Sequence, residues 1–206
     1  NFAWGEIATH MFMHGGLMHI LFNMYALWAF GTPLERMWGT RKFLFFYFSA
    51  GLGAALIHTG VNMYTVNQGV EALVGAGLNE SEVIRLLVTE QAPQQWLQLA
   101  DTDTIQKMVN TFYSPAVGAS GAIYGILVAF GMSFPNSELF LIFLPVLIKA
   151  KYFIPALIGL DLFSGITGYS IFGAGIAHFA HVGGAVFGFL MMWYWKKNQF
   201  NQNRWD

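Results

Sequence analysis

The chain lacks cysteine altogether and contains little charge. Without cysteine it can form neither a disulfide nor a thiolate metal site. Only 10% of its 206 residues are Asp, Glu, Lys or Arg, whereas a soluble globular domain has about 25%. The formal net charge is −1, so the chain has no excess of positive charge to offer to nucleic acid. These absences argue against a disulfide-rich secreted domain, a thiolate metal centre and a nucleic-acid-binding protein.

Hydrophobic residues make up 55% of the chain and aromatic residues 17%. This composition predicts a single all-α membrane domain over residues 1–206, built as a bundle of transmembrane helices. The stretch 139–148 is apolar but too short to span, so we expect an interfacial or re-entrant segment there. The five stretches expected to span a bilayer are 17–38, 43–61, 115–134, 152–169 and 178–195.

Basic residues gather on one side of these five spans, and this predicts how the bundle is oriented. Eight of the ten Lys and Arg residues would lie there, and such an excess marks the cytoplasmic side. The first, third and fifth spans would therefore all begin at the outer face of the membrane. The eight residues are Arg36, Arg41, Lys42, Lys149, Lys151, Lys196, Lys197 and Arg204.

Residues 62–114 differ from the rest because polar and acidic side chains are frequent and apolar residues recur at helical spacing. Asn79 and Glu82 match a capping box, and Pro93 is expected to start another short helix. We therefore predict an extramembrane insertion of short amphipathic helices on the outer side. It would act either as a folded cap on the membrane surface or as a site that recruits substrate.

Ser120 lies near the expected start of the third span, and His181 lies near the start of the fifth. A serine needs a base to become a nucleophile, and a histidine within hydrogen-bond reach is the usual one. Asp161 is the only carboxylate well inside a span, and its position in the fourth span suggests mid-membrane depth. We therefore expect a Ser–His dyad rather than a Ser–His–Asp triad.

Polar groups near the start of the first span are candidates for stabilising the oxyanion that serine attack would create. His19 and Asn23 are four residues apart, so they share one helix face. The backbone N–H of Ser120 would add a donor in the unsatisfied first turn of its helix. The sequence Gly184-x-x-x-Gly188 predicts close packing of the fifth span on the third, which would bring His181 to Ser120.

Other functions remain open on the residues alone. The histidines could ligate a metal or a haem, but no His-Glu-x-x-His motif is present and no carboxylate lies close to them, so we expect neither a metal nor another cofactor. An ion-coupled transporter needs buried charge, and only Asp161 offers it. The histidines concerned are His10, His14, His19, His178 and His181.

Taken together, three motifs on alternate spans resemble the rhomboid family of intramembrane serine proteases. A histidine-rich stretch leads into His-x-x-x-Asn, then Gly-x-Ser-Gly follows, and then Ala-His-x-x-Gly. The motifs stand here as His10-Met-Phe-Met-His14-Gly-Gly-Leu-Met-His19-Ile-Leu-Phe-Asn23, Gly118-Ala-Ser120-Gly121 and Ala180-His181-Val-Gly-Gly184.

The resemblance implies a role for each residue of these motifs. Ser120 would be the nucleophile and His181 the general base, with Tyr124 stacked on His181 and Gly118 keeping the approach to the serine open. The oxyanion would be bound by the Ser120 N–H and by the side chains at positions 19 and 23. Water would reach the site through a polar funnel. The residues of this funnel are His10, His14, His19 and Asn23.

The resemblance also implies partners and a location. Substrates would be single-span membrane proteins, cut in or near their transmembrane segment in the lipid bilayer. The family core has six spans, so one span is expected to precede Asn1. We expect the bacterial inner membrane, with the site facing the outer side. The alternative function is a non-catalytic rhomboid-like factor that binds membrane proteins or monitors their quality.

Lateral entry of substrate is expected at the fourth span, because that span carries no catalytic motif. It joins the fifth span through the glycine-rich stretch 173–175, and small-residue hinges permit such a helix to move. Phe163 and Phe172 are expected to close this side against Phe22 of the first span.

Overall fold

The computed structural model of the chain describes residues 10–114, 118–141, 144–169 and 177–199. It is 80% helical, which agrees with the all-α class that the sequence predicts. The chain divides into two compact units. The first comprises residues 1–58 and 116–206, and the second comprises residues 59–115.

The first unit contains the helices that the sequence predicts as spans. The expected first span is a continuous helical stretch of three parts, because a π-helical segment lies just before Pro33. Proline has no N–H to donate to the carbonyl four residues earlier, and the wider π turn accommodates that gap. The elements are η1 (His10–Phe12), α2 (Leu17–Ala26), η2 (Leu27–Gly31), α3 (Thr32–Trp38), the first part of α4 (Thr40–Gly75), α8 (Ser120–Ser133), α9 (Ala150–Thr167) and α10 (His178–Gln199).

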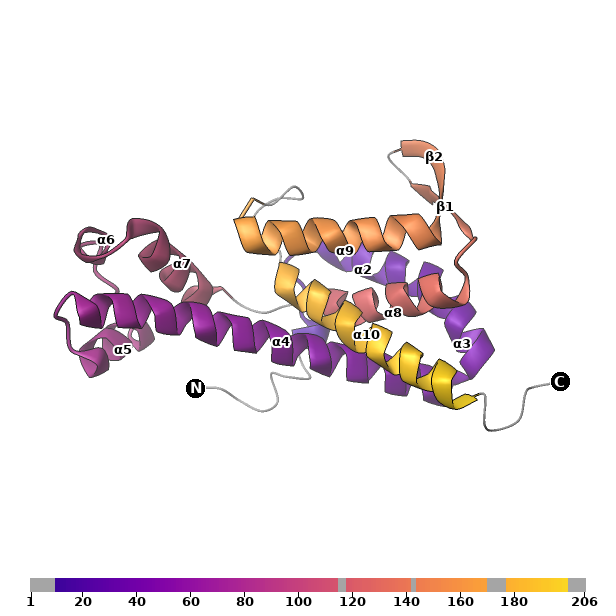
Figure 1. Cartoon of the computed structure of the whole chain (residues 1–206), viewed down its shortest axis with the longest axis horizontal. Helices are drawn as coiled ribbons and strands as arrows, with labels where there is room; N and C mark the ends of the chain where they lie inside the picture. The colour runs from indigo at the N-terminus through magenta and orange to yellow at the C-terminus, as the bar shows by residue number, and fades with distance from the viewer. Residues whose placement is uncertain (1–9, 115–117, 142–143, 170–176, 200–206) are drawn as a thin grey trace. The chain divides into compact units, whose positions relative to one another are not determined.

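Helix α8 is the central helix of this unit, and residues 121–130 are all buried. Figure 1 shows it surrounded by α9, α10 and α2. Its contact with α10 is a backbone contact through paired glycines. A Cβ on Gly184 would overlap the carbonyl of Gly121, and a Cβ on Gly188 would lie 2.6 Å from the α-carbon of Gly125. Only glycine permits such an approach, and the close packing expected from Gly184-x-x-x-Gly188 is present.

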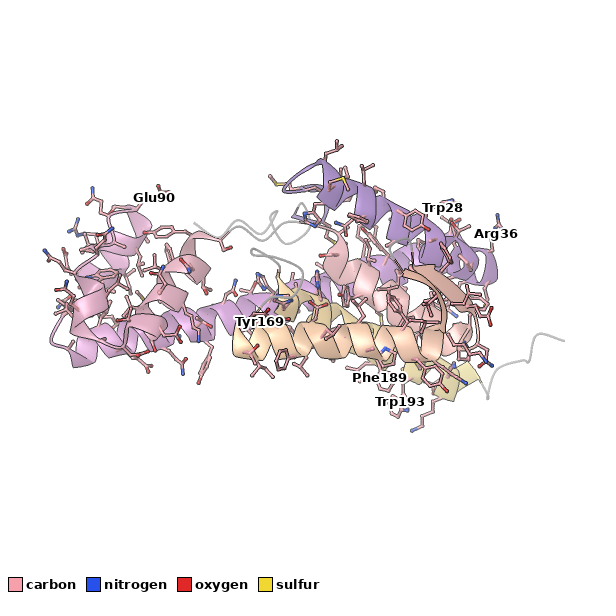
Figure 2. All side chains as sticks on the ribbon, turned by 90° about the horizontal axis from the view of Figure 1, so that it is seen from above. Trp28, Arg36, Glu90, Tyr169, Phe189 and Trp193 are labelled. Carbon is pink, nitrogen blue, oxygen red and sulfur yellow. The ribbon has the colours of Figure 1, made fainter. Side chains whose placement is uncertain are left out.

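Large apolar side chains cover the outside of the first unit. Trp28 is 67% exposed, and Phe189 and Trp193 on α10 are about half exposed. Figure 2 shows these three side chains pointing away from the helices. Such a surface is unfavourable in water and suits lipid. Judged by length and apolar composition alone, one helix among the described residues, α4, is able to cross a membrane unaided.

Two helices have bounds that differ from those of the expected spans. Helix α8 has 14 residues and begins at Ser120; the expected start, Pro115, lies outside the described residues. Helix α4 has 36 residues and continues to Gly75, although the expected span ended at residue 61. The helix continues through the polar residues after position 61, because Val70 and Leu73 on this part of α4 pack into the core of the second unit.

The apolar stretch after α8, for which the sequence predicts an interfacial or re-entrant segment, forms a pair of antiparallel strands. Strand β1 (Glu138–Leu141) pairs antiparallel with β2 (Leu144–Lys149), and Glu138 stands opposite Lys149. Opposite charges facing one another across a strand pair favour this register. Helix α9 follows directly, with Lys149 as its N-cap.

The second unit is a small helical module with its own core. Asn79 caps α5 as expected, since its side chain accepts from the N–H groups of Ser81 and Glu82. Glu82 bonds the Arg85 guanidinium, which lowers the pKa of this exposed carboxyl. Pro93 does not start a helix, because α6 begins three residues later. The elements are the last part of α4, α5 (Glu80–Val88), α6 (Trp96–Leu99) and α7 (Thr102–Tyr113).

Candidate active site

Ser120 and His181 lie within hydrogen-bond distance of each other. The His181 Nε2 and the Ser120 Oγ are 2.8 Å apart. Helices α8 and α10 run in the same direction, because Gly121 meets Gly184 and Gly125 meets Gly188. Ser120 lies one residue before Gly121, and His181 lies three residues before Gly184, so the contact between these two glycines sets the separation of the pair. The shared direction is the one that the charge distribution predicts.

Asp161 also reaches this pair, which the sequence analysis did not expect. Its Oδ1 lies 3.2 Å from the Nδ1 of His181, and its side chain is 1% exposed. Ser120, His181 and Asp161 therefore have the connectivity of a Ser–His–Asp triad. The sequence analysis placed Asp161 toward mid-membrane, away from Ser120 and His181, whereas the structure brings its carboxylate to the His181 ring.

Tyr124 contacts both members of the histidine–aspartate pair. Its ring is stacked on the His181 ring, with centroids 4.2 Å apart and an interplanar angle of 11°. Its hydroxyl donates a hydrogen bond to the Oδ2 of Asp161. The stacking agrees with the role that the family resemblance implies for Tyr124. The hydroxyl contact was not expected, and it holds the second oxygen of the carboxylate.

His178 is the fifth polar residue of this cluster, and the sequence analysis did not place it in the site. Its Nδ1 lies 2.5 Å from the same Oδ1 of Asp161, and its side chain is 9% exposed. The available signal was the spacing His178-x-x-His181, which puts both rings on one helix face. Despite these histidines, the described residues contain no group of three that could hold a metal ion.

Of the oxyanion candidates, the His19 side chain lies near the serine. The Nδ1 of His19 accepts from the N–H of Gly15 at 3.4 Å, so the hydrogen of the neutral ring is on Nε2. Gly118 has a φ of +110°, and a Cβ there would lie 2.8 Å from His19 Nε2 and 3.8 Å from Ser120 Oγ. A side chain at Gly118 would therefore fill the space between the proposed donor and the nucleophile. Asn23 is buried, and its Nδ2 donates to the His19 carbonyl at 2.9 Å.

The two histidines proposed for water access precede this region. The ring of His14 meets the ring of His19 edge-on, with centroids 5.3 Å apart. Both nitrogens of His14 are buried and have no hydrogen-bond partner among the described residues. His10 begins the short helix η1, and its side chain lies outside what the structure describes.

Comparison with known proteins identifies the family. The Rhomboid domain profile matches residues 1–198. The chain belongs to the rhomboid family. This family consists in general of intramembrane serine proteases, although some of its members are inactive.

Three relatives illustrate the range of rhomboid proteins that the chain resembles. It is 28% identical over 184 residues to the mitochondrial presenilin-associated rhomboid-like protein of Rattus norvegicus, covering 89% of this chain and 35% of that protein. It is 25% identical over 192 residues to the mitochondrial Rhomboid protein 1 of Saccharomyces cerevisiae, covering 93% and 42%. It is 40% identical over 53 residues to the rhomboid protease GluP of Bacillus subtilis, covering 26% and 10%.

The chain thus spans about a third of the length of the first curated relatives that it matches. No solved structure matches it.

Proposed function

We propose that this chain is an intramembrane serine endopeptidase, which cleaves single-span membrane proteins in or near their transmembrane segment. The observation that carries the proposal is the 2.8 Å contact between Ser120 Oγ and His181 Nε2, inside a helical bundle with an apolar outer surface. Polar side chains in such surroundings carry a free-energy cost, so their presence there indicates a function.

The reaction would follow from these positions. His181 Nε2 takes the proton as Ser120 Oγ attacks the peptide carbonyl carbon, and the carbonyl oxygen becomes an oxyanion. The oxyanion accepts hydrogen bonds from the Ser120 N–H, from His19 Nε2 and from Asn23. The histidine then gives its proton to the leaving amine as the C–N bond breaks. Water attacks the acyl-enzyme with His181 again as base, which releases the acid and restores the serine.

Asp161 would act as a positioning residue in this sequence. An ionised carboxylate only accepts hydrogen bonds, so Nδ1 of His181 carries the hydrogen and Nε2 presents its lone pair to Ser120. The carboxylate also stabilises the imidazolium that forms when His181 takes the proton. Stacking on Tyr124 restrains the same ring from its face.

The length of α8 supports cleavage below the membrane surface. Its 14 residues extend about 21 Å, which is about 9 Å less than the thickness of a hydrocarbon core. At its C-terminal end, Lys196 Nζ donates to the Met132 carbonyl at 2.7 Å, and lysines of this kind reach toward the polar boundary. If that end lies at one boundary, Ser120 lies below the other, within the depth of a substrate helix.

The relatives favour a different membrane from the bacterial one expected from the sequence. The rhomboid proteins named above that match along most of the chain carry mitochondrial names. We therefore favour a mitochondrial inner membrane over the bacterial membrane expected from sequence. Fractionation of cells that express the tagged chain would test this proposal, and recovery in another membrane would contradict it.

The activity is tested with the purified chain and a fluorophosphonate probe, together with a single-span membrane substrate. We expect labelling and cleavage by the native chain and neither by Ser120→Ala, while His181→Ala should be reduced to background because the two residues act as a unit. Ser133→Ala, at the other end of the same helix, is the matched control and should behave as native. Binding of substrate without labelling or cleavage would instead support the non-catalytic alternative.

A further inference from the structure

The carboxylate of Asp161 has more partners than the proposed reaction requires. Its Oδ2 accepts from the Tyr124 hydroxyl, and its Oδ1 faces two imidazole nitrogens. The Nδ1 of His178 lies 2.5 Å away and the Nδ1 of His181 lies 3.2 Å away. The shorter of the two contacts is thus made by the histidine to which the reaction assigns no role.

His178 is also in a buried environment, where an apolar side chain would have a lower desolvation free energy. It is 8% exposed, and it begins the helix that carries His181 one turn later. A buried imidazole in a membrane bundle has a cost that must be offset by hydrogen bonding or by function. Because residues three apart lie on one face of a helix, the two rings approach Asp161 together.

We propose that His178 is a positioning residue for the proposed peptidase reaction, acting through Asp161. Its Nδ1–H occupies one lone pair of Oδ1 and leaves the other for the Nδ1–H of His181, since a carboxylate oxygen can accept two hydrogen bonds. With Tyr124 on the second oxygen, the carboxylate is held at both ends. The chain of hydrogen bonds thus runs from His178 through Asp161 and His181 to Ser120. This inference rests on the proposed function.

The reason for a second histidine lies in the freedom of an aspartate side chain. The terminal torsion of aspartate is broad, so one hydroxyl partner does not fix the direction in which Oδ1 points. Two donors on opposite oxygens do fix it. The orientation of Oδ1 in turn determines which nitrogen of His181 carries the hydrogen. His178 would thus affect the chemical step and leave substrate binding unchanged.

The test measures kcat and KM for cleavage of a single-span substrate by the purified chain. We expect His178→Leu to lower kcat about 10- to 100-fold, with KM within about twofold, since the hydrogen bond lost is one to a charged group. His178→Asn can place an N–H near the position of Nδ1, so we expect kcat within about threefold of native. His178→Gln places its N–H farther out and should not rescue. Should His178→Leu fail to fold, the Asn and Gln variants decide the question.

Ser164→Ala is the matched control for packing of the buried face of α9 that carries Asp161. Ser164 is buried on the same helix as Asp161, and its Oγ has no hydrogen-bond partner among the described residues. This variant should keep the native kcat. If it loses as much as His178→Leu, the loss reflects packing and the proposal is wrong.

A double-mutant cycle shows whether His178 acts through Asp161. In an Asp161→Asn background, His178→Leu should cause little further loss, because the residue through which it acts has already been changed. Independent, multiplicative losses would overturn the proposal, and so would a native kcat for His178→Leu. Ser120→Ala separates the two hypotheses: if it still cleaves, the proposed function fails, whereas Ser120-dependent cleavage that ignores His178 refutes only this inference.

Discussion

The contact between Gly121 and Gly184 permits a quantitative test of how packing sets the site. In Gly184→Ala, the new Cβ would overlap the carbonyl of Gly121 and lie 2.6 Å from its carbon. Carbon atoms in good contact are about 3.5–4 Å apart, so α8 and α10 must separate by about 1 Å there. The contact between Ser120 and His181, now 2.8 Å, would then exceed hydrogen-bond length.

Two losses of different size are expected from this single methyl group. Overpacking of a well-packed interface costs about 1–3 kcal/mol of stability, whereas a displacement of about 1 Å at a reacting group costs about 10²-fold in rate. Gly188→Ala creates a smaller overlap, since the nearest atom to its new Cβ is the Gly125 α-carbon at 2.6 Å, and it lies one turn farther from the serine. The loss of stability should therefore be smaller than in Gly184→Ala, and the loss of activity should be smaller in greater proportion.

The assay combines the rate of fluorophosphonate labelling of Ser120, the kcat for a single-span substrate, and the thermal unfolding midpoint. Gly159→Ala in α9 is the control, because a Cβ there meets nothing within 4 Å; all three quantities should match those of the native chain. The reasoning fails if Gly184→Ala keeps the native labelling rate. It fails equally if the rates of Gly184→Ala and Gly188→Ala fall together in proportion to their stabilities.

Three further predictions follow from the site. His19→Ala should lower kcat by about 10²–10³-fold, because His19 Nε2 faces the space beside the nucleophile. Asn23→Ala should lower kcat by less, because the Asn23 side chain already bonds the His19 carbonyl. Unchanged steady-state rates in both variants would contradict the oxyanion assignment. Asp161→Asn should lower kcat by about 10³-fold, because it disturbs the tautomer of His181, the general base. Circular dichroism should show normal folding of this variant. A native kcat would indicate that Ser120 and His181 act as a dyad without Asp161. Phe163→Ala on α9 should raise cleavage of membrane-embedded substrate and leave a short soluble peptide unaffected if this helix is the entry side, with Phe22→Ala acting similarly; equal effects on both substrates would argue against lateral entry.

The sequence was sufficient for the parts of the fold that depend on local pattern. Apolar runs and charge asymmetry predict the helices and their directions, and the spacing Gly184-x-x-x-Gly188 predicts the seam between α8 and α10. Asn79 predicts a helix cap because its side chain acts on neighbours in the chain. Each of these signals lies within a few residues of the feature that it determines.

What the sequence did not predict depends on depth and on contacts between distant segments. The contact of Asp161 with His181 joins residues twenty apart, through a segment partly outside the described residues. The expected closing residue Phe172 and the hinge at 173–175 also lie outside the described residues. The antiparallel strands after α8 were not predicted because a short apolar run has no decisive periodicity.

The membrane setting explains why the carboxylate has so many partners. In a water-exposed triad, solvent can satisfy the remaining lone pairs of the aspartate. Asp161 is 1% exposed in a bundle whose outer face suits lipid, so protein groups must supply the donors that water would otherwise provide. Tyr124 and His178 supply two of them, and His181 supplies the third. On this reasoning, the donors around Asp161 are a condition for keeping a charged residue beside Ser120 in the membrane, and the loss of any one should weaken the others.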